Sequence, residues 1–231
     1  MSDQLEPKRT SRDLNEIQEL LAHWLKEKIS DSEAVITDLR RPSGSGMSSE
    51  TLLFNAKSEN TSSSNESSLV ARLAPTPADI PVFQKYDLDL QVRIMKIVRE
   101  KTSIPVPDVL WLETDPTVLG VPFFIMEQVN GRVPPDIPPY VFGGWLLDAS
   151  LENQKILEHQ SVEIISQLSK IDLEDLDTDF LEFEDVGNSH LRRHFSAQQN
   201  YYRWVIGNNR NHPVIEPVSY THLTLPTKRI V

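Results

Sequence analysis

Hydrophobic positions near the start of the chain recur at the spacing of an amphipathic helix. Leucine, isoleucine and tryptophan share one face between Leu14 and Ile29, behind Asp13, a typical N-cap with Glu16 three residues further on. Residues 1–10 are polar, and we expect them to form a disordered tail.

Five short apolar segments bounded by turn residues predict the strands of one sheet. They are Ala34–Leu39, Thr51–Ala56, Leu69–Leu73, Val109–Leu112 and Val121–Met126. A glycine and serine loop, residues 41–49, joins the first pair, and the polar segment 58–68 is expected to be the loop of the next hairpin. A helix over Asp87–Lys101 is apolar around much of its circumference, so we expect other elements to cover it on two sides.

The pattern becomes helical beyond Gly131. One helix is predicted from about Leu151, with an apolar face that extends to Ile171, and another over Leu191–Val205. The sequence therefore predicts an α+β class: a lobe of five antiparallel strands over residues 11–130 and a helical region over residues 131–217.

Two clusters in the helical region are open to more than one interpretation. Eight acids and no basic residue occur between Asp172 and Asp185. A solvated loop is the ordinary interpretation, and electrostatic attraction of a cationic substrate is the alternative. Tyr201, Tyr202 and Trp204 are interpreted as core rather than as a binding site.

Composition excludes several classes of protein. The chain has 231 residues, 39% of them hydrophobic, and a net charge of -11 that disfavours nucleic acid as a partner. No apolar run approaches the ~20 residues of a membrane span, so no membrane partner is expected. The absence of cysteine excludes disulfides and thiolate sites and agrees with a cytoplasmic location.

The decapeptide that runs from Pro122 to Gly131 is the first candidate for chemistry. Its apolar run stops at Glu127, and the decapeptide itself ends in Asn-Gly. This is the pattern expected of a buried strand that leads into an exposed hinge. The backbone N–H and C=O groups of Glu127, Gln128 and Val129 are candidates for binding a flat heterocycle such as adenine. The alternative is an ordinary strand end that binds nothing.

The loop after the first strand is the second candidate. It contains Gly44, Ser45, Gly46, Met47, Ser48 and Ser49, whose N–H and hydroxyl groups suit a chain of phosphates. It is neither a Walker A loop nor a Rossmann turn, because no Gly-Lys-Ser/Thr follows and the next element reads as a strand. A plain flexible hairpin is the alternative.

Arg72, within an apolar strand, is the third candidate. Its permanent charge either faces solvent or points into the same cleft to meet phosphate. The order of glycine loop, basic strand residue, helix, two strands, hinge and helical lobe matches a nucleotide-dependent phosphotransferase.

With these motifs the chain resembles the aminoglycoside phosphotransferase family, over about residues 15–217, and most of all the branch related to the kinase-like region of acyl-CoA dehydrogenase fusion proteins. The resemblance is carried by Gly44–Thr51, Leu69–Pro75, Tyr86–Leu90, Val106–Pro107, Thr114–Gly131 and Tyr140–Leu146. It implies a two-lobe protein-kinase-like fold in which residues 44–49 cover the phosphates of ATP, or of GTP as the alternative. It also implies that Arg72 replaces the usual phosphate-contacting lysine and that residues 127–129 hold adenine.

Two residues depart from the family pattern. Ser49 stands where the third loop glycine is expected, and Gln91 stands where the inserted helix normally carries a glutamate to pair with the basic residue. Asp87 and Asp89 are the candidates to replace that glutamate.

The catalytic part of the family pattern is absent. There is no His-x-Asp loop and no later magnesium-binding Asp, since Glu216 is the only acid after Asp185. Residues 218–231 read like a translated sequencing adapter, with a short natural strand as the alternative, so we expect a helical lobe that is incomplete in this chain.

The expected function is therefore that of the nucleotide-binding half of an ATP-dependent kinase for a small-molecule hydroxyl, and this half is itself expected to be inactive. Mg²⁺ is expected for the full-length protein, with its ligands outside this chain. A non-catalytic kinase-like binding module is the alternative.

Overall fold

The computed structural model describes residues 12–42, 49–57, 66–76, 82–134, 139–174, 176–207, 213–215 and 217. The chain divides into two compact units, Met1–Phe180 and Leu181–Val231. The sequence predicted a boundary between two lobes at residue 131. The division after Phe180 is a different one and does not test it, so the lobe boundary stays a prediction.

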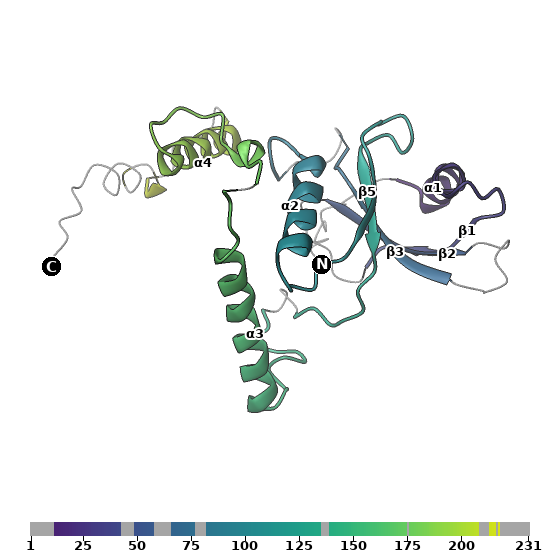
Figure 1. The fold of residues 1–231 in the computed structure, drawn as a ribbon, viewed down its shortest axis with the longest axis horizontal. Helices are drawn as coiled ribbons and strands as arrows, with labels where there is room; N and C mark the ends of the chain where they lie inside the picture. The colour runs from purple at the N-terminus through teal and green to yellow at the C-terminus, as the bar shows by residue number, and fades with distance from the viewer. Residues whose placement is uncertain are drawn as a thin grey trace, which may run out of the picture. The chain divides into compact units, whose positions relative to one another are not determined.

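The first unit contains a five-stranded antiparallel sheet in the order β1-β2-β3-β5-β4 (Figure 1). The strands are β1 (Val35–Arg40), β2 (Glu50–Lys57), β3 (Glu66–Leu73), β4 (Val109–Glu113) and β5 (Phe123–Glu127). All five predicted strands are confirmed. The expected polar loop was too long, because Glu66, Ser67 and Ser68 already pair with the end of β2.

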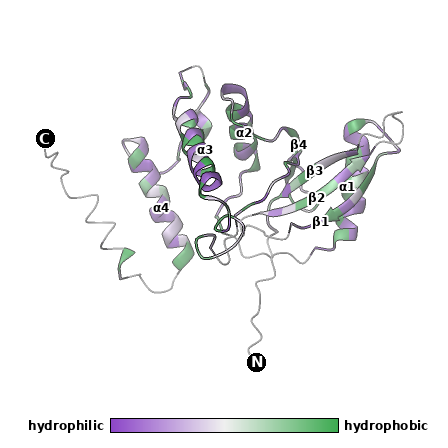
Figure 2. Cartoon of the chain, turned by 90° about the horizontal axis from the view of Figure 1, so that it is seen from below, coloured by the Kyte–Doolittle hydropathy of each residue, from purple (hydrophilic) through white to green (hydrophobic). Residues whose placement is uncertain are grey.

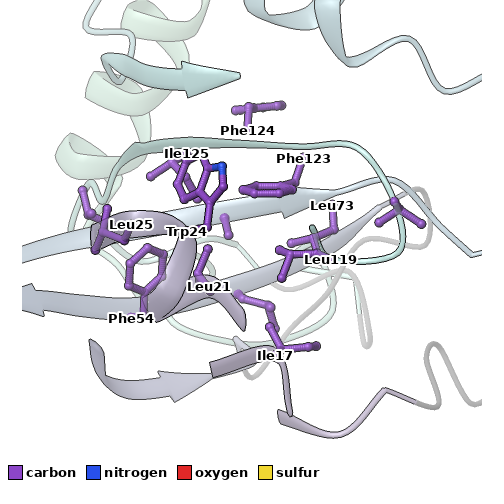
Figure 3. Packing of buried hydrophobic residues seen from close by; sticks show 14 of the residues in the cluster. Ile17, Leu21, Trp24, Leu25, Phe54, Leu73, Leu119, Phe123, Phe124 and Ile125 are labelled. Atoms are coloured by element: carbon purple, nitrogen blue, oxygen red, sulfur yellow. The ribbon is translucent and has the colours of Figure 1, made fainter. Parts of the chain in front are cut away.

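Helix α1 (Leu14–Ile29) covers one face of the sheet. Asp13 begins it as predicted, since its carboxylate accepts a hydrogen bond from the Asn15 N–H at 2.8 Å. The apolar face of α1 packs on alternate residues of three strands, as Figure 3 shows for part of this core. The buried residues are Ile17, Leu21, Trp24 and Leu25 of α1, and Leu52, Phe54, Leu69, Ala71, Leu73, Phe123 and Ile125 of the sheet.

Helix α2 (Leu88–Lys101) packs against β4 and β5. Phe124 points away from Phe123 and α1, in keeping with strand alternation (Figure 3). The expectation that α2 is covered on two sides is wrong, because Leu88 and Val92 are its only buried residues and Ile94 is 39% exposed. One side of α2 remains open in the described chain.

Helix α3 (Leu151–Ser169) follows in the first unit, and a short 3-10 turn (Asp179–Leu181) precedes α4 (His190–Ile206) of the second. Both helices were predicted, and Ser150 and Ser189 cap them. Neither helix contains a buried residue, although hydrophobic residues occur along both (Figure 2). No helix in the described ranges is long and apolar enough to cross a bilayer.

Candidate functional site

Arg72 lies on the face of the sheet opposite α1. Its strand neighbours Ala71 and Leu73 belong to the core under α1, so alternation directs Val70 and Arg72 to the other face. Arg72 stands opposite Thr51 of β2 and Phe124 of β5, in the middle of the sheet. Arg72 is half-buried on this face, so it does not simply face solvent.

The Arg72 guanidinium carries a charge that no acid in the described chain neutralises. One amino nitrogen, Nη2, donates to the Ser49 hydroxyl at 2.5 Å, while the buried Nε has no acceptor among the described residues. Burial lowers the pKa of this guanidinium from its ordinary value. Arginine nevertheless remains protonated in proteins, so the site holds a buried N–H donor and a positive charge without an anion.

None of the acids considered as a partner for Arg72 reaches it. The Asp87 carboxylate instead caps α2 by accepting from the Leu90 N–H at 2.8 Å. Within the described residues, no hydrogen bond or ion pair joins Arg72 to Gln91 or to Asp89. The ion pair that the resemblance implies between the basic strand residue and the helix is thus not formed among the described residues.

Two further arginines hold the base of the glycine and serine loop. The Glu50 side chain is only 8% exposed, and its carboxylate lies 2.8 Å from Arg41 Nη2 and 3.8 Å from Arg12 Nε. Because Arg41 begins the loop and Glu50 follows it, this cluster ties the two ends of the loop together. Sequence reasoning missed it, although an arginine and a glutamate flanking a small-residue loop were a usable signal.

The candidate residues Gly44, Ser45, Gly46, Met47 and Ser48 lie outside the described part of the chain. Ser49 is the one loop candidate that is described, and it contacts Arg72. The structure therefore brings two of the phosphate candidates together.

The hinge candidates lie at the end of β5, where Glu127 is its last residue, and directly after it. The Glu127 N–H donates to the Asp108 carbonyl at 3.0 Å, and the Gln128 N–H donates to the Ser68 carbonyl at 3.0 Å. The Val129 N–H has no partner among the described residues, and Val129 is 68% exposed. Of the three N–H groups proposed for a heterocycle, only that of Val129 is open to a ligand.

A pocket of about 560 Å³ adjoins the same hinge but lies on the other face of the sheet. Leu25 of α1, Leu69 of β3 and Trp111 of β4 line it together with Glu127, Gln128 and Val129. Neither Arg72 nor Ser49 borders it. The hinge thus separates two surfaces, one that faces α1 and one that carries Arg72.

The acidic segment is partly neutralised within each unit. Asp177 lies 3.3 Å from Arg93 of α2, whose guanidinium lies 3.8 Å from the Phe180 ring centroid. In the second unit, Glu182 contacts Arg193 and lies 2.8 Å from His190. No three His, Asp or Glu residues of the described ranges gather as metal ligands would.

Comparisons with known proteins bear on the fold. No family model matches the chain. Over 46 residues it is 41% identical to a protein of Arabidopsis thaliana named as a probable acyl-CoA dehydrogenase, IBR3, and this match covers 20% of the chain and 6% of that protein.

A solved structure is similar over most of the chain. It is a Ralstonia eutropha protein described provisionally as an aminoglycoside phosphotransferase, matched with a TM-score of 0.56 at 17% identity. The chain has an aminoglycoside phosphotransferase-like fold. The match covers 91% of this chain and 54% of the other, so the chain spans about half the length of its neighbour. The predicted α+β, kinase-like class is confirmed, and the incompleteness of the helical lobe stays a prediction.

Proposed function

We propose that this chain is the nucleotide-binding half of an ATP-dependent phosphotransferase whose acceptor is the hydroxyl group of a small molecule. The uncompensated Arg72 charge carries the proposal. Buried charges in proteins are normally paired, so a half-buried guanidinium with one hydroxyl and no carboxylate beside it in the described part of the chain suits an anionic ligand.

The residues of this face, together with the hinge beyond β5, fit the parts of a nucleoside triphosphate. Arg72 and Ser49 would contact the phosphates, and the Val129 N–H would donate to a ring nitrogen of adenine. Arg72 of β3 stands opposite Phe124 of β5. Strand β5 ends at Glu127, three residues after Phe124, which is a distance of about 10 Å along the strand. A nucleotide bound at this face would therefore have to span this distance from the hinge to Arg72, with Val70 and Met126 between them.

ATP would supply the transferable phosphoryl group. Arg72 would hold and neutralise the phosphate oxygens, and residues 44–48 are proposed to close over them. The described residues offer no fitting site for Mg²⁺, so no step is assigned to the metal. No aspartate follows Asp185, and we expect this chain to bind nucleotide without transferring phosphate.

A non-catalytic binding module is the second candidate, favoured by the same lack of catalytic acids. Such a module would be expected to have a closed helical region. Helices α3 and α4 instead contain no buried residue, which supports the nucleotide-binding half over the module. Phosphotransfer by purified 1–231 would contradict both.

The experiment is a titration of a fluorescent ATP analogue with wild-type protein, Arg72→Ala and Arg40→Ala. Loss of a charge-assisted hydrogen bond removes about 1.5–3 kcal/mol, so Arg72→Ala should weaken binding about 10- to 100-fold. Arg40→Ala removes an exposed arginine paired with Asp38 and should leave the affinity unchanged. No binding by the wild type, or equal binding by Arg72→Ala, would refute the proposal.

A further inference from the structure

The pocket on the α1 face is the second surface with the properties of a ligand site. Its volume of about 560 Å³ falls within the range of small-molecule sites. It is bordered by α1, by the adjoining ends of β2 and β3, by β4 and by the end of β5. Because Arg72 lies on the opposite face of the sheet, this pocket does not belong to the proposed nucleotide site.

The wall of the pocket is apolar and partly aromatic. Leu25 and Leu69 are buried beside it, and the half-buried Trp111 indole contributes an aromatic surface. Trp24 packs edge-to-face against that indole, with ring centroids 6.1 Å apart. This contact restricts the Trp111 ring, so an aromatic wall is in place before any ligand arrives, which favours a flat ligand.

The Glu127 side chain brings a negative charge to the same face. Phe123 and Ile125 of β5 belong to the core under α1, so strand alternation directs Glu127 to that face as well. In the register it stands opposite Leu69, another member of this core. The Glu127 carboxylate accepts a hydrogen bond from the Asp108 N–H at 3.2 Å. No lysine, arginine or histidine of the described chain forms an ion pair with it.

The neighbouring cations do not occupy this carboxylate. Lys57 also borders the pocket, but it stands opposite Glu66, which shares its face of β3 with Arg72, so alternation directs the Lys57 side chain to the other face. Lys28 of α1 lies 3.0 Å from the Glu113 carboxylate, which neutralises it. Among the ionisable side chains of the described residues that line the pocket, alternation thus directs only an acid to its face.

The spacing of the aromatic wall and the carboxylate suits one class of ligand. Trp111 stands opposite Ile125, and Glu127 is two residues further along β5, a distance of about 7 Å. An aromatic ring that rests on Trp111 and Leu69 therefore places an ammonium group on a short arm at Glu127. The indole itself also attracts a cation through the negative face of its ring.

We propose that this pocket binds a small aromatic cation, with its ring against Leu69 and Trp111 and its ammonium group at the Glu127 carboxylate. The net charge of -11 of the whole chain favours the approach of such a cation. Neither contact uses Arg72 or Ser49, so the site is independent of the proposed phosphotransferase function.

The probe is 2-naphthylmethylammonium, with 2-naphthylmethanol as its neutral analogue. Equilibrium dialysis against the full chain at pH 7, read by naphthalene fluorescence, gives both affinities. The ammonium should bind about three- to five-fold more tightly than the alcohol at low salt. High ionic strength should reduce this preference, because salt screens a partly exposed ion pair. Equal binding of the two probes at low salt would overturn the proposal.

Removal of the carboxylate locates the contact. Glu127→Gln should weaken binding of the ammonium about three- to five-fold, to the level of the alcohol, and should leave binding of the alcohol unchanged. Glu66→Gln is the matched control, since it removes an exposed acid from the neighbouring strand on the opposite face. It should retain the preference. An unchanged preference in Glu127→Gln would show that the ammonium binds elsewhere.

A cation built into the chain gives a second test. Ser67 shares its face of β3 with Leu69, so Ser67→Arg places a guanidinium within diagonal reach of Glu127 and should abolish the preference for the ammonium. Ser68→Arg adds the same charge on the other face and should retain it. Both serines are exposed, and thermal unfolding checks that both variants fold. Binding of the ammonium to Ser67→Arg as tightly as to the wild type would overturn the proposal.

Discussion

The Trp24 indole donates a hydrogen bond to the Glu113 carboxylate at 2.8 Å and joins helix α1 to strand β4. Lys28, one turn further along α1, lies 3.0 Å from the same carboxylate. The Trp24 ring also packs edge-to-face against Phe123, with centroids 4.9 Å apart. One tryptophan thus connects a charged pair at the surface with the centre of the core.

This contact predicts a pH dependence. The hydrogen bond from Trp24, and next the contact with Lys28, lower the pKa of Glu113 from 4.5 to about 2. A group whose pKa is lower in the folded state stabilises that state above its unfolded pKa. This stabilisation is lost as the pH falls from about 4.5 toward 2.

Urea unfolding between pH 7 and pH 2.5 tests this. Glu113→Gln should be less stable than the wild type at pH 7, and the difference should shrink below about pH 4. Glu158→Gln, which removes an exposed carboxylate from the middle of α3, should follow the wild-type curve. A constant difference between wild type and Glu113→Gln at every pH would contradict the assignment.

Arg72 is predicted to favour nucleotide binding at the expense of the stability of the folded protein. A buried N–H without an acceptor costs about 1–3 kcal/mol, and methionine fills a similar volume without that cost. Arg72→Met should therefore unfold at the same temperature as the wild type or higher, while it loses nucleotide affinity. Thermal unfolding without nucleotide gives the first quantity.

Arg40→Met is the matched control, because Arg40 is exposed and paired with Asp38 at 3.0 Å. It should change neither stability nor nucleotide affinity by much. If Arg72→Met unfolded several degrees below the wild type, Arg72 would be a structural residue and the phosphate role would lose its support.

Exposed aliphatic residues on α3 predict self-association. Val162 is 61% exposed and Ile165 67% exposed, and the helix contains no buried residue. Apolar patches of this kind drive association. The double variant Val162→Glu with Ile165→Glu should elute as a smaller species than the wild type in size-exclusion chromatography at equal concentration.

His159→Glu adds an acid at an exposed polar position of the same helix and serves as the control. It should retain the wild-type elution volume. A wild-type protein that remains monomeric at high concentration would contradict the prediction, because the exposed apolar residues of α3 would then not drive association.

Local patterns predicted the elements, because a helix cap or an apolar run depends on neighbours in the sequence. Asp13 was recognised as the cap of α1, and the strand that ends at Glu127 was placed within two residues at its start and one at its end. Long-range contacts were not predictable in this way. The Glu113 partners come from a helix 85 to 89 residues earlier, and no periodicity relates them.

The candidate site was predictable in part for the same reason. Arg72 stands out because a charge interrupts an apolar strand, and strand alternation fixes its face once α1 is placed. Its contact with Ser49, and the lack of an acidic partner among the residues that the structure describes, depend on sheet register and on the direction of α2 side chains. The hydrogen bonds that occupy the Glu127 and Gln128 N–H groups likewise required the paired strands.

The end of α1 gives a last prediction, on backbone conformation. Ser30 closes the helix with φ 53° and ψ 40°, and its N–H bonds to the carbonyls of Lys26 and Glu27. This left-handed conformation costs a residue with a Cβ about 1–2 kcal/mol and costs glycine little, while glycine loses more backbone entropy on folding. Ser30→Gly should therefore raise the free energy of unfolding by about 0.5–1 kcal/mol.

Urea denaturation at pH 7 measures the difference. Ser32→Gly is the control, since Ser32 is exposed in the same turn and does not have a positive φ. It should gain nothing and lose a few tenths of a kcal/mol, about the entropy cost of glycine. Equal effects of the two substitutions would show that the left-handed conformation of Ser30 does not limit the stability of α1.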